Sequence, residues 1–291
     1  MLTRKHLWLL VVLTLMWGIN WPMMKLSVRE MSPLYFRAIT MMLGALCLML
    51  WYRTRNVALW PQRDQWADVV RLGLPNVLGW HTLAIMGVSQ LASGRAAILG
   101  FTMPIWTILL GVAFFKEKLT QRALIALVCV AAAVGLLTWH ELMSMAGKPL
   151  GVIFMLGAAV CWAVGTLMMR NSHHTLGVEA LTVWMMLLSS FVILVLALIW
   201  EPVPSWNYSG LFWMSLVWGV LINYGVAQVI WFGMAKSLPP VTSVMSITAV
   251  PIIGTMTATF IVGEIPHWQD WVAVIFVCVA IGTAVLRRNP A

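Results

Sequence analysis

The chain has 291 residues, of which 62% are hydrophobic and 9% are charged, and its mean hydropathy is +0.91. It carries 21 methionines and 18 tryptophans. A water-soluble domain of this length does not need such a composition, so the sequence predicts an integral membrane protein. The orientation in the membrane and anionic lipid account for the net charge of +9, so we expect membrane lipid as a partner and no nucleic acid.

The apolar runs are long enough to cross a bilayer, whose core of about 30 Å needs about 20 residues of helix. The alternating pattern of membrane β-barrels is absent, so the spans are expected to be helices. The first five predicted spans are Leu7–Ser27, Pro33–Tyr52, Val69–Leu91, Gly94–Phe115 and Arg122–Trp139. The second five are Leu150–Met169, Val178–Trp200, Gly210–Ala235, Pro239–Val262 and Trp268–Leu286. The short loops leave no room for a soluble domain, so function must lie within the bundle or at its mouths.

The basic start of the chain is similar to a signal peptide, but no small-residue cleavage site follows it, so we expect an uncleaved first helix. Ten spans place both termini on one side. Of the 18 lysines and arginines, all but five fall on that side, which predicts cytoplasmic termini in a multi-pass protein of the cell (inner) membrane. The five on the other side are Lys25, Arg29, Arg37, Arg95 and Lys148.

An internal repeat organises the chain. MWGINWPMMK, residues 16–25, aligns with CWAVGTLMMR, residues 161–170, at an offset of 145. Later landmarks recur at an offset of 147, namely Asn76 and Asn223, Pro104 and Pro251, Glu117 and Glu264, and Gly135 and Gly282. Two units follow, 1–140 and 149–288. Each unit has five spans, an odd number, so the second unit must enter the membrane from the opposite face. The predicted fold class is therefore an all-α integral membrane protein with ten transmembrane helices in two inverted five-helix repeats, and substrate sites are expected where the halves meet.

Three prolines, Pro22, Pro104 and Pro251, interrupt apolar spans and are predicted to break their helices. Irregular backbone at that depth has to face protein or a water-filled cavity. The alternative is a simple kink that neighbouring helices satisfy. The equivalent positions of Pro104 and Pro251 in the two units favour a cavity.

The ordered set of motifs resembles the drug/metabolite transporter superfamily, EamA type, which carries two tandem repeats. The matching motifs are Trp17-Gly18-x-Asn20, Pro33 with Arg37, Pro104 and Pro251, Glu117-x-Leu119-Thr120, Gly263-Glu264, and Gly135 with Gly282. The resemblance implies a basket of ten helices that works as a secondary transporter. Such transporters commonly export amino acids, nucleobases, drugs, vitamins or metallophores.

Polar side chains inside a span need a reason, because a charged one costs about 2.5 to 3.5 kcal/mol at the bilayer centre on insertion scales. His81 lies near the middle of the third span, where it could bind a substrate carboxylate or exchange a proton; the alternative is a neutral imidazole bonded to another helix. Arg37 near the start of the second span could extend to the interface, whereas the resemblance favours an anion clamp or structural pin.

Amides could bridge helices, and deep aromatic side chains could line a cavity or only pack. We predict that a subset of these, together with His81 and Arg37, binds substrate, and that His81 also couples protons. The predicted substrate-binding residues are Trp17, Asn20, Arg37, Trp80, His81, Trp162, Asn223, Tyr224 and Gln228.

All nine acidic residues fall in loops or at span ends, so no carboxylate is expected at the midplane. A carrier of permanent cations would need one there. We therefore expect an exporter of small polar, zwitterionic or anionic, amino-acid-like metabolites that works by alternating access. The alternatives are an exporter of nucleobases, drugs or a carboxylate-rich metallophore, and a non-transporting membrane receptor or assembly protein.

Enzyme signatures are missing. His140-Glu141 begins like a zinc-protease motif, but Ser144 stands at the position of the second ligand, and no Gly-x-Ser-x-Gly motif occurs. The four cysteines lie in apolar runs without close pairing. We expect no enzyme, no cofactor and no metal site, and a small molecule as the partner.

Small residues spaced four apart could serve a homodimer or, as the alternative, packing inside the bundle. These residues are Gly157, Cys161 and Gly165, and Ala131 with Gly135.

Overall fold

The computed structural model describes residues 4–115, 120–143, 149–173, 175–235 and 240–285, and every regular element in them is helical. The elements of the first unit are α1 (Arg4–Val28), α2 (Pro33–Thr54), the 3₁₀ turn η1 (Arg63–Gln65), α3 (Trp66–Gly73), the π-helical η2 (Leu74–Gly79), α4 (Trp80–Gln90), α5 (Ser93–Gly100), α6 (Met103–Phe115) and α7 (Gln121–Met143). Those of the second unit are α8 (Pro149–Arg170), α9 (Val178–Trp200), α10 (Gly210–Val217), the π-helical η3 (Trp218–Val226), α11 (Ala227–Ala235), α12 (Pro240–Val262) and α13 (Trp268–Val285).

Nine of the ten predicted spans coincide with one helical run each, because α3, η2 and α4 are continuous, as are α10, η3 and α11; the fourth span covers two helices, α5 and α6. Six helical segments are long and apolar enough to cross a membrane: Trp8–Val28, Pro33–Thr54, Ser93–Phe114, Pro149–Arg170, Val178–Trp200 and Gly210–Trp231. Shorter apolar helices are Gln121–Leu137, Ala249–Val262 and Trp268–Thr283. The run of α3, η2 and α4 belongs to neither of these two groups, so ten membrane crossings stay a prediction.

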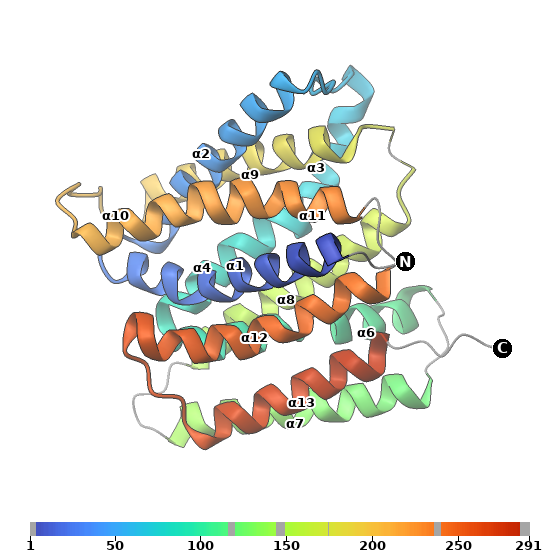
Figure 1. Cartoon of the computed structure of the whole chain (residues 1–291), viewed down its shortest axis with the longest axis vertical. Helices are drawn as coiled ribbons and strands as arrows, with labels where there is room; N and C mark the ends of the chain where they lie inside the picture. The colour runs from blue at the N-terminus through green and yellow to red at the C-terminus, as the bar shows by residue number, and fades with distance from the viewer. Residues whose placement is uncertain (1–3, 116–119, 144–148, 174, 236–239, 286–291) are drawn as a thin grey trace.

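The helices run side by side in one bundle (Figure 1), and the two units interlock within it. Helix α1 packs on α12 and on the run from α10 to α11, while α8 packs on α4 and on α5 and α6. The first helix of each unit therefore contacts the third and fourth runs of the other. Corresponding helices also meet, α2 with α9 and α7 with α13. The start of α1 and the end of α13 lie at the same end of the bundle (Figure 1).

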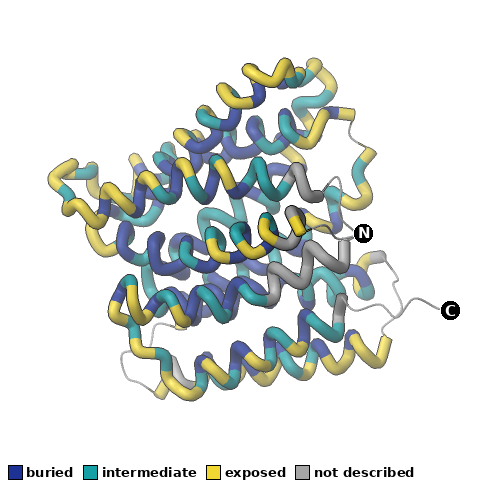
Figure 2. The backbone as a smooth tube through the Cα atoms, viewed as in Figure 1, coloured by how far each residue is buried: buried dark blue, intermediate teal, exposed yellow. Residues whose placement is uncertain are grey.

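Burial follows the pattern expected in lipid. Buried residues face the middle of the bundle (Figure 2), and large apolar side chains cover much of the outside. Phe260 is 84% exposed and Phe114 is 75% exposed, for example. Lipid tails can solvate such a surface, whereas a soluble protein rarely presents large apolar patches.

Glycines set the close approach between helices of different units. A Cβ on Gly18 of α1 would lie 2.4 Å from Ile253 Cγ2 of α12, and one on Gly165 of α8 would lie 2.3 Å from Asn76 Cγ. Gly165, Gly157 and Cys161 therefore pack within the bundle, against Asn76, Leu83 and Gly79 respectively. In lipid the hydrophobic effect does not drive helices together, so they associate through close van der Waals packing, which small residues permit.

The small residues of α7 behave differently, since Ala131 and Gly135 lie on its exposed face. A Cβ on Gly135 would have nothing within 4 Å. A homodimer through this face stays a prediction.

At the end of the bundle opposite the termini, charged side chains of one unit cap helices of the other. The Glu201 carboxylate accepts from the backbone N–H groups of Leu34 (2.9 Å) and Tyr35 (3.0 Å), and Glu264 accepts from the N–H and hydroxyl of Ser93, both at 2.7 Å. Anions at helix N-termini and cations at C-termini are favourable, since they complete unpaired backbone groups.

Further contacts at this end of the bundle belong with these caps, and we call the whole set the cap network. Glu30 accepts from the N–H of Ser209 (2.8 Å) and from its hydroxyl, which lower the pKa of the Glu30 carboxyl below its ordinary value of 4.5. The Arg29 guanidinium donates to the Val262 carbonyl (3.0 Å) at the end of α12. Within the first unit, the Lys25 ammonium donates to three carbonyls that end α4, those of Val88, Ser89 and Leu91.

The remaining member is an ion pair between Arg95 of α5 and Asp270 of α13. Arg95 Nε lies 2.6 Å from Asp270 Oδ1, and the two side chains are 9% and 6% exposed. The prediction placed Arg95 and Asp270 at span ends, and the structure shows that they are buried against each other there. Glu117, the repeat equivalent of Glu264, lies outside the described residues.

Candidate functional site

Two of the three predicted helix breaks are wrong. Pro22 lies inside α1 and Pro251 inside α12, and both helices are continuous. Each proline still removes one backbone donor, but the neighbouring turns keep the helix intact. At Pro104 the run is interrupted, because α5 ends at Gly100 and α6 begins at Met103.

The irregular backbone lies instead in two π-helical segments that sequence analysis missed. The repeat offset of 147 carries residues 74–79 of η2 onto 221–226 of η3. In η2, Pro75 lacks an N–H, which breaks the α-helical ladder and favours the wider turn. π-helical turns inside α-helices occur frequently at functional sites. Here η3 carries Asn223 and Tyr224, and η2 lies directly before the turn of α4 that carries His81; all three residues line one cavity.

That cavity lies where the two units meet and has a volume of about 170 Å³. All nine residues predicted to bind substrate line it. The structure adds residues that were not predicted: Trp21, Met24, Ala84, Phe101, Met103 and Trp231. Trp231 follows Gln228 by one helical turn, a spacing that could have indicated it, whereas the methionines carried no signal in the sequence.

A buried chain of polar groups joins three of the predicted residues. Arg37 is 3% exposed, and its Nη1 donates to the Tyr224 hydroxyl. The Tyr224 hydroxyl lies 3.2 Å from His81 Nδ1. Since a guanidinium only donates, the tyrosine oxygen accepts from Arg37 and its own proton is left for His81 Nδ1. This assignment, made from the hydrogen-bond network, puts the proton of the neutral imidazole on Nε2.

Arg37 does not extend to the interface, which excludes the alternative that the sequence left open. Its Nη2 donates to Met24 Sδ at 2.7 Å, and its Nε is buried without a hydrogen-bond partner. This edge of the guanidinium is therefore only weakly satisfied by protein, and an anionic ligand that displaced Met24 would satisfy it better.

Three amide side chains of the cavity make no hydrogen bond to the residues that the structure describes. Asn20 and Asn223 are buried, Gln228 is partly buried, and their side chains make no hydrogen bond within the described part of the chain. Asn76, the repeat equivalent of Asn223, differs because it donates to the Leu72 carbonyl (3.1 Å) and packs on α8. The two halves have therefore diverged at this position, and the second unit supplies the amide to the cavity.

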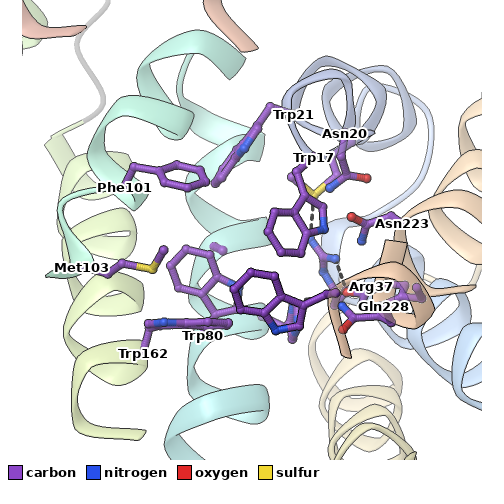
Figure 3. A pocket seen from close by; sticks show the side chains of 15 residues that line it. Trp17, Asn20, Trp21, Arg37, Trp80, Phe101, Met103, Trp162, Asn223 and Gln228 are labelled. Atoms are coloured by element: carbon purple, nitrogen blue, oxygen red, sulfur yellow. Dashed lines mark hydrogen bonds between the residues drawn. The ribbon is translucent and has the colours of Figure 1, made fainter. Parts of the chain in front are cut away.

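Aromatic pairs form the rest of the wall. The ring centroids of Trp80 and Trp162 lie 5.2 Å apart, those of Trp17 and Trp231 lie 5.3 Å apart, and Trp21 packs edge-on against Phe101. Figure 3 shows the arrangement: Asn20, Arg37, Asn223 and Gln228 lie on one side of the cavity, and Trp80, Trp162, Phe101 and Met103 on the other. The cavity thus has a polar side and an aromatic side.

Comparison with known proteins agrees with a duplicated membrane bundle. A model described as the EamA-like transporter family matches residues 4–139 and again 149–286. The uncharacterized transporter YoaV of Bacillus subtilis (strain 168) is 24% identical over 247 residues, covering 84% of each chain. A probable amino-acid metabolite efflux pump of Salmonella typhimurium is 22% identical over 276 residues, covering 90% of this chain and 89% of the relative.

A solved crystal structure shares the fold, with a TM-score of 0.66 at 18% identity and with coverage of 95% of this chain and 96% of that one. A helical bundle of two like units with apolar flanks and an internal cavity agrees with the class of membrane transport proteins. Because the family model covers nearly the whole chain, in two copies, the protein belongs to the EamA-like transporter family.

Proposed function

We propose that the protein is a secondary transporter that exports a small polar, zwitterionic or anionic, amino-acid-like metabolite from the cytoplasm. The observation that carries the proposal is the cavity between the units, where Nε of the buried Arg37 has no hydrogen-bond partner and three amide side chains make no hydrogen bond to the described part of the chain. The relative named as an amino-acid metabolite efflux pump supports the substrate class and the direction.

Alternating access between two inverted units, with ten crossings in all, is the mechanism that we propose. Each first helix packs on the third and fourth runs of the other unit, a reciprocal relation that a two-fold axis between the units would produce; with five crossings in each unit, that axis would lie in the membrane plane. The start of α1 and the end of α13 lie at one end, as an even number of crossings requires. The charge asymmetry of the sequence supports cytoplasmic termini in the cell inner membrane.

In this mechanism the cap network closes the outer end. It joins the units through Glu30, Glu201, Glu264, Arg29 and the pair of Arg95 with Asp270. The cavity can open to the outside only when these bonds break. A bound substrate would have to favour that opened state over the closed one.

We also propose that His81 couples protons to transport. A proton on Nδ1 would remove its capacity to accept from the Tyr224 hydroxyl, and would add charge beside Arg37. Arg37 would then bind an anionic substrate more strongly or release Tyr224. Protonation and deprotonation of His81 would then be the step at which a pH gradient drives transport.

Flux into proteoliposomes tests the proposal. Amino acids supplied at one side should exchange across the wild-type protein, and Arg37→Gln and His81→Gln should each reduce flux at least about tenfold if their polar contacts act in transport. Arg71→Gln, an exposed arginine outside this cavity, is the matched control and should transport normally. Undiminished flux in both cavity variants would refute the site, and a wild-type protein that moves no solute would favour a receptor or assembly role.

A further inference from the structure

We infer that the preferred ligand of the cavity is an aromatic monocarboxylate, an anion with one planar apolar ring and no ammonium group. The inference rests on the proposed transport function and narrows it. It follows from the charge of the cavity, from the weakly bonded edge of the Arg37 guanidinium and from the shape of the aromatic side.

The charge of the cavity favours an anion over a zwitterion. Arg37 is buried there, and no carboxylate lines the cavity among the residues that the structure describes. A buried charge without a partner is strongly unfavourable. A monoanion neutralises the site on binding, whereas a zwitterion leaves the same net charge and adds an ammonium group that has to be desolvated.

Arg37 presents the edge that a carboxylate needs. Nε and Nη2 form one edge of the planar guanidinium group, which can bind both oxygens of a carboxylate side by side. Nε has no partner and Nη2 contacts only the sulfur of Met24, a weak acceptor on a flexible side chain. Nη1 is held by the Tyr224 hydroxyl, so the group is oriented before the ligand arrives. Met24 is therefore a displaceable occupant of the carboxylate position.

The opposite side of the cavity fits one ring. The whole cavity has a volume of about 170 Å³, close to that of an engineered apolar cavity of about 150 Å³ that binds benzene, so it holds one ring and little more. Trp80 and Trp162, with Phe101 close by, present both faces and edges of aromatic rings, which suits stacked and edge-on contacts. An aliphatic acid of two carbons would leave this side empty, and a ring with a large substituent would not fit without movement.

Binding to the purified full-length protein tests the inference, with its own tryptophan fluorescence as the signal. The probes are phenylacetate, L-phenylalanine and acetate, which share a carboxylate but differ in the ring and in the ammonium group. Phenylacetate should bind at least about tenfold more tightly than either of the others, because it alone satisfies both sides of the cavity.

Two substitutions separate this role from a structural one. Met24→Ala should tighten phenylacetate binding several-fold, because the carboxylate no longer displaces the sulfur, and Arg37→Gln should weaken it at least about tenfold. Met23→Ala, a matched change of a neighbouring buried methionine that does not line the cavity, should leave binding unchanged. If Met24 only supports the structure, Met24→Ala should weaken phenylacetate binding rather than tighten it.

The comparison of the three probes uses the wild-type protein, so it can refute the inference even if a variant fails to fold. If phenylalanine binds as tightly as phenylacetate, the preference for a monoanion is wrong while amino-acid transport stands. If acetate binds as tightly, the ring site is wrong. If none of the three binds and none is transported, the inference and the proposed function fail together.

Discussion

Replacing Arg95 with methionine should destabilise the protein strongly, because it leaves the carboxylate of Asp270 buried. The two side chains are 9% and 6% exposed, so solvent screens the pair little, and the contact is two-pronged, with Nε to Oδ1 at 2.6 Å and Nη2 to Oδ2 at 3.4 Å. The carboxylate would keep the N–H of His267 at 2.8 Å. Breaking a buried pair in this way costs about 3 to 5 kcal/mol, and we expect the lower half of that range.

The assay is reversible unfolding of the purified protein in mixed micelles as denaturing detergent is added. Arg95→Met and Asp270→Leu are measured singly and together, with Arg71→Met as an exposed control. The double variant should lose less than the sum of the single losses, by about 1 to 3 kcal/mol, since no charge is then left unpaired. A loss below about 1 kcal/mol for Arg95→Met, or additive losses, would show that the pair does not join the units.

Three further outcomes are expected. Gly165→Ala should cost about 1 to 3 kcal/mol in the same assay because its Cβ would meet Asn76, while Gly135→Ala, with nothing within 4 Å, should be neutral or slightly stabilising; equal effects would contradict the packing. Glu30→Gln should lower thermal stability at pH values above the ordinary pKa of 4.5, with the difference from wild type vanishing as the pH falls through the lowered folded pKa; a difference that grows in acid would reverse the sign. Tyr224→Phe removes the hydroxyl beside the imidazole and should shift the pH profile of transport, so an unchanged profile would count against proton coupling through His81.

Much of the architecture could be predicted because lipid imposes simple rules. Apolar runs of span length located the helical runs, and the offset of 147 between landmarks such as Asn76 and Asn223 identified the two units. The cavity residues were also predictable in part, since amides and charges at depth need a reason to be there. All nine of the predicted residues line one cavity.

Other features depend on contacts that one sequence does not reveal. Hydropathy gives no sign that Arg95 pairs with Asp270 of the other unit, and a methionine such as Met24 looks the same in a core and in a cavity. The prolines of α1 and α12 were expected to break helices, but intact turns around Pro22 and Pro251 keep them continuous. The irregular backbone lies in the π-helical turns instead, which have no reliable sequence pattern.

Alternating access is tested most directly by a cross-link across the cap network. Ser93 and Glu264, whose side chains lie 2.7 Å apart at the bonding atoms, would be replaced by cysteine in a variant that lacks the four native cysteines, and joined with a short cleavable reagent. Flux should fall to background when the cross-link is complete and should return when the reagent is cleaved, while substrate still binds from the opposite side. Flux that continues at its full rate through a completely cross-linked protein would contradict transport by opening of this end.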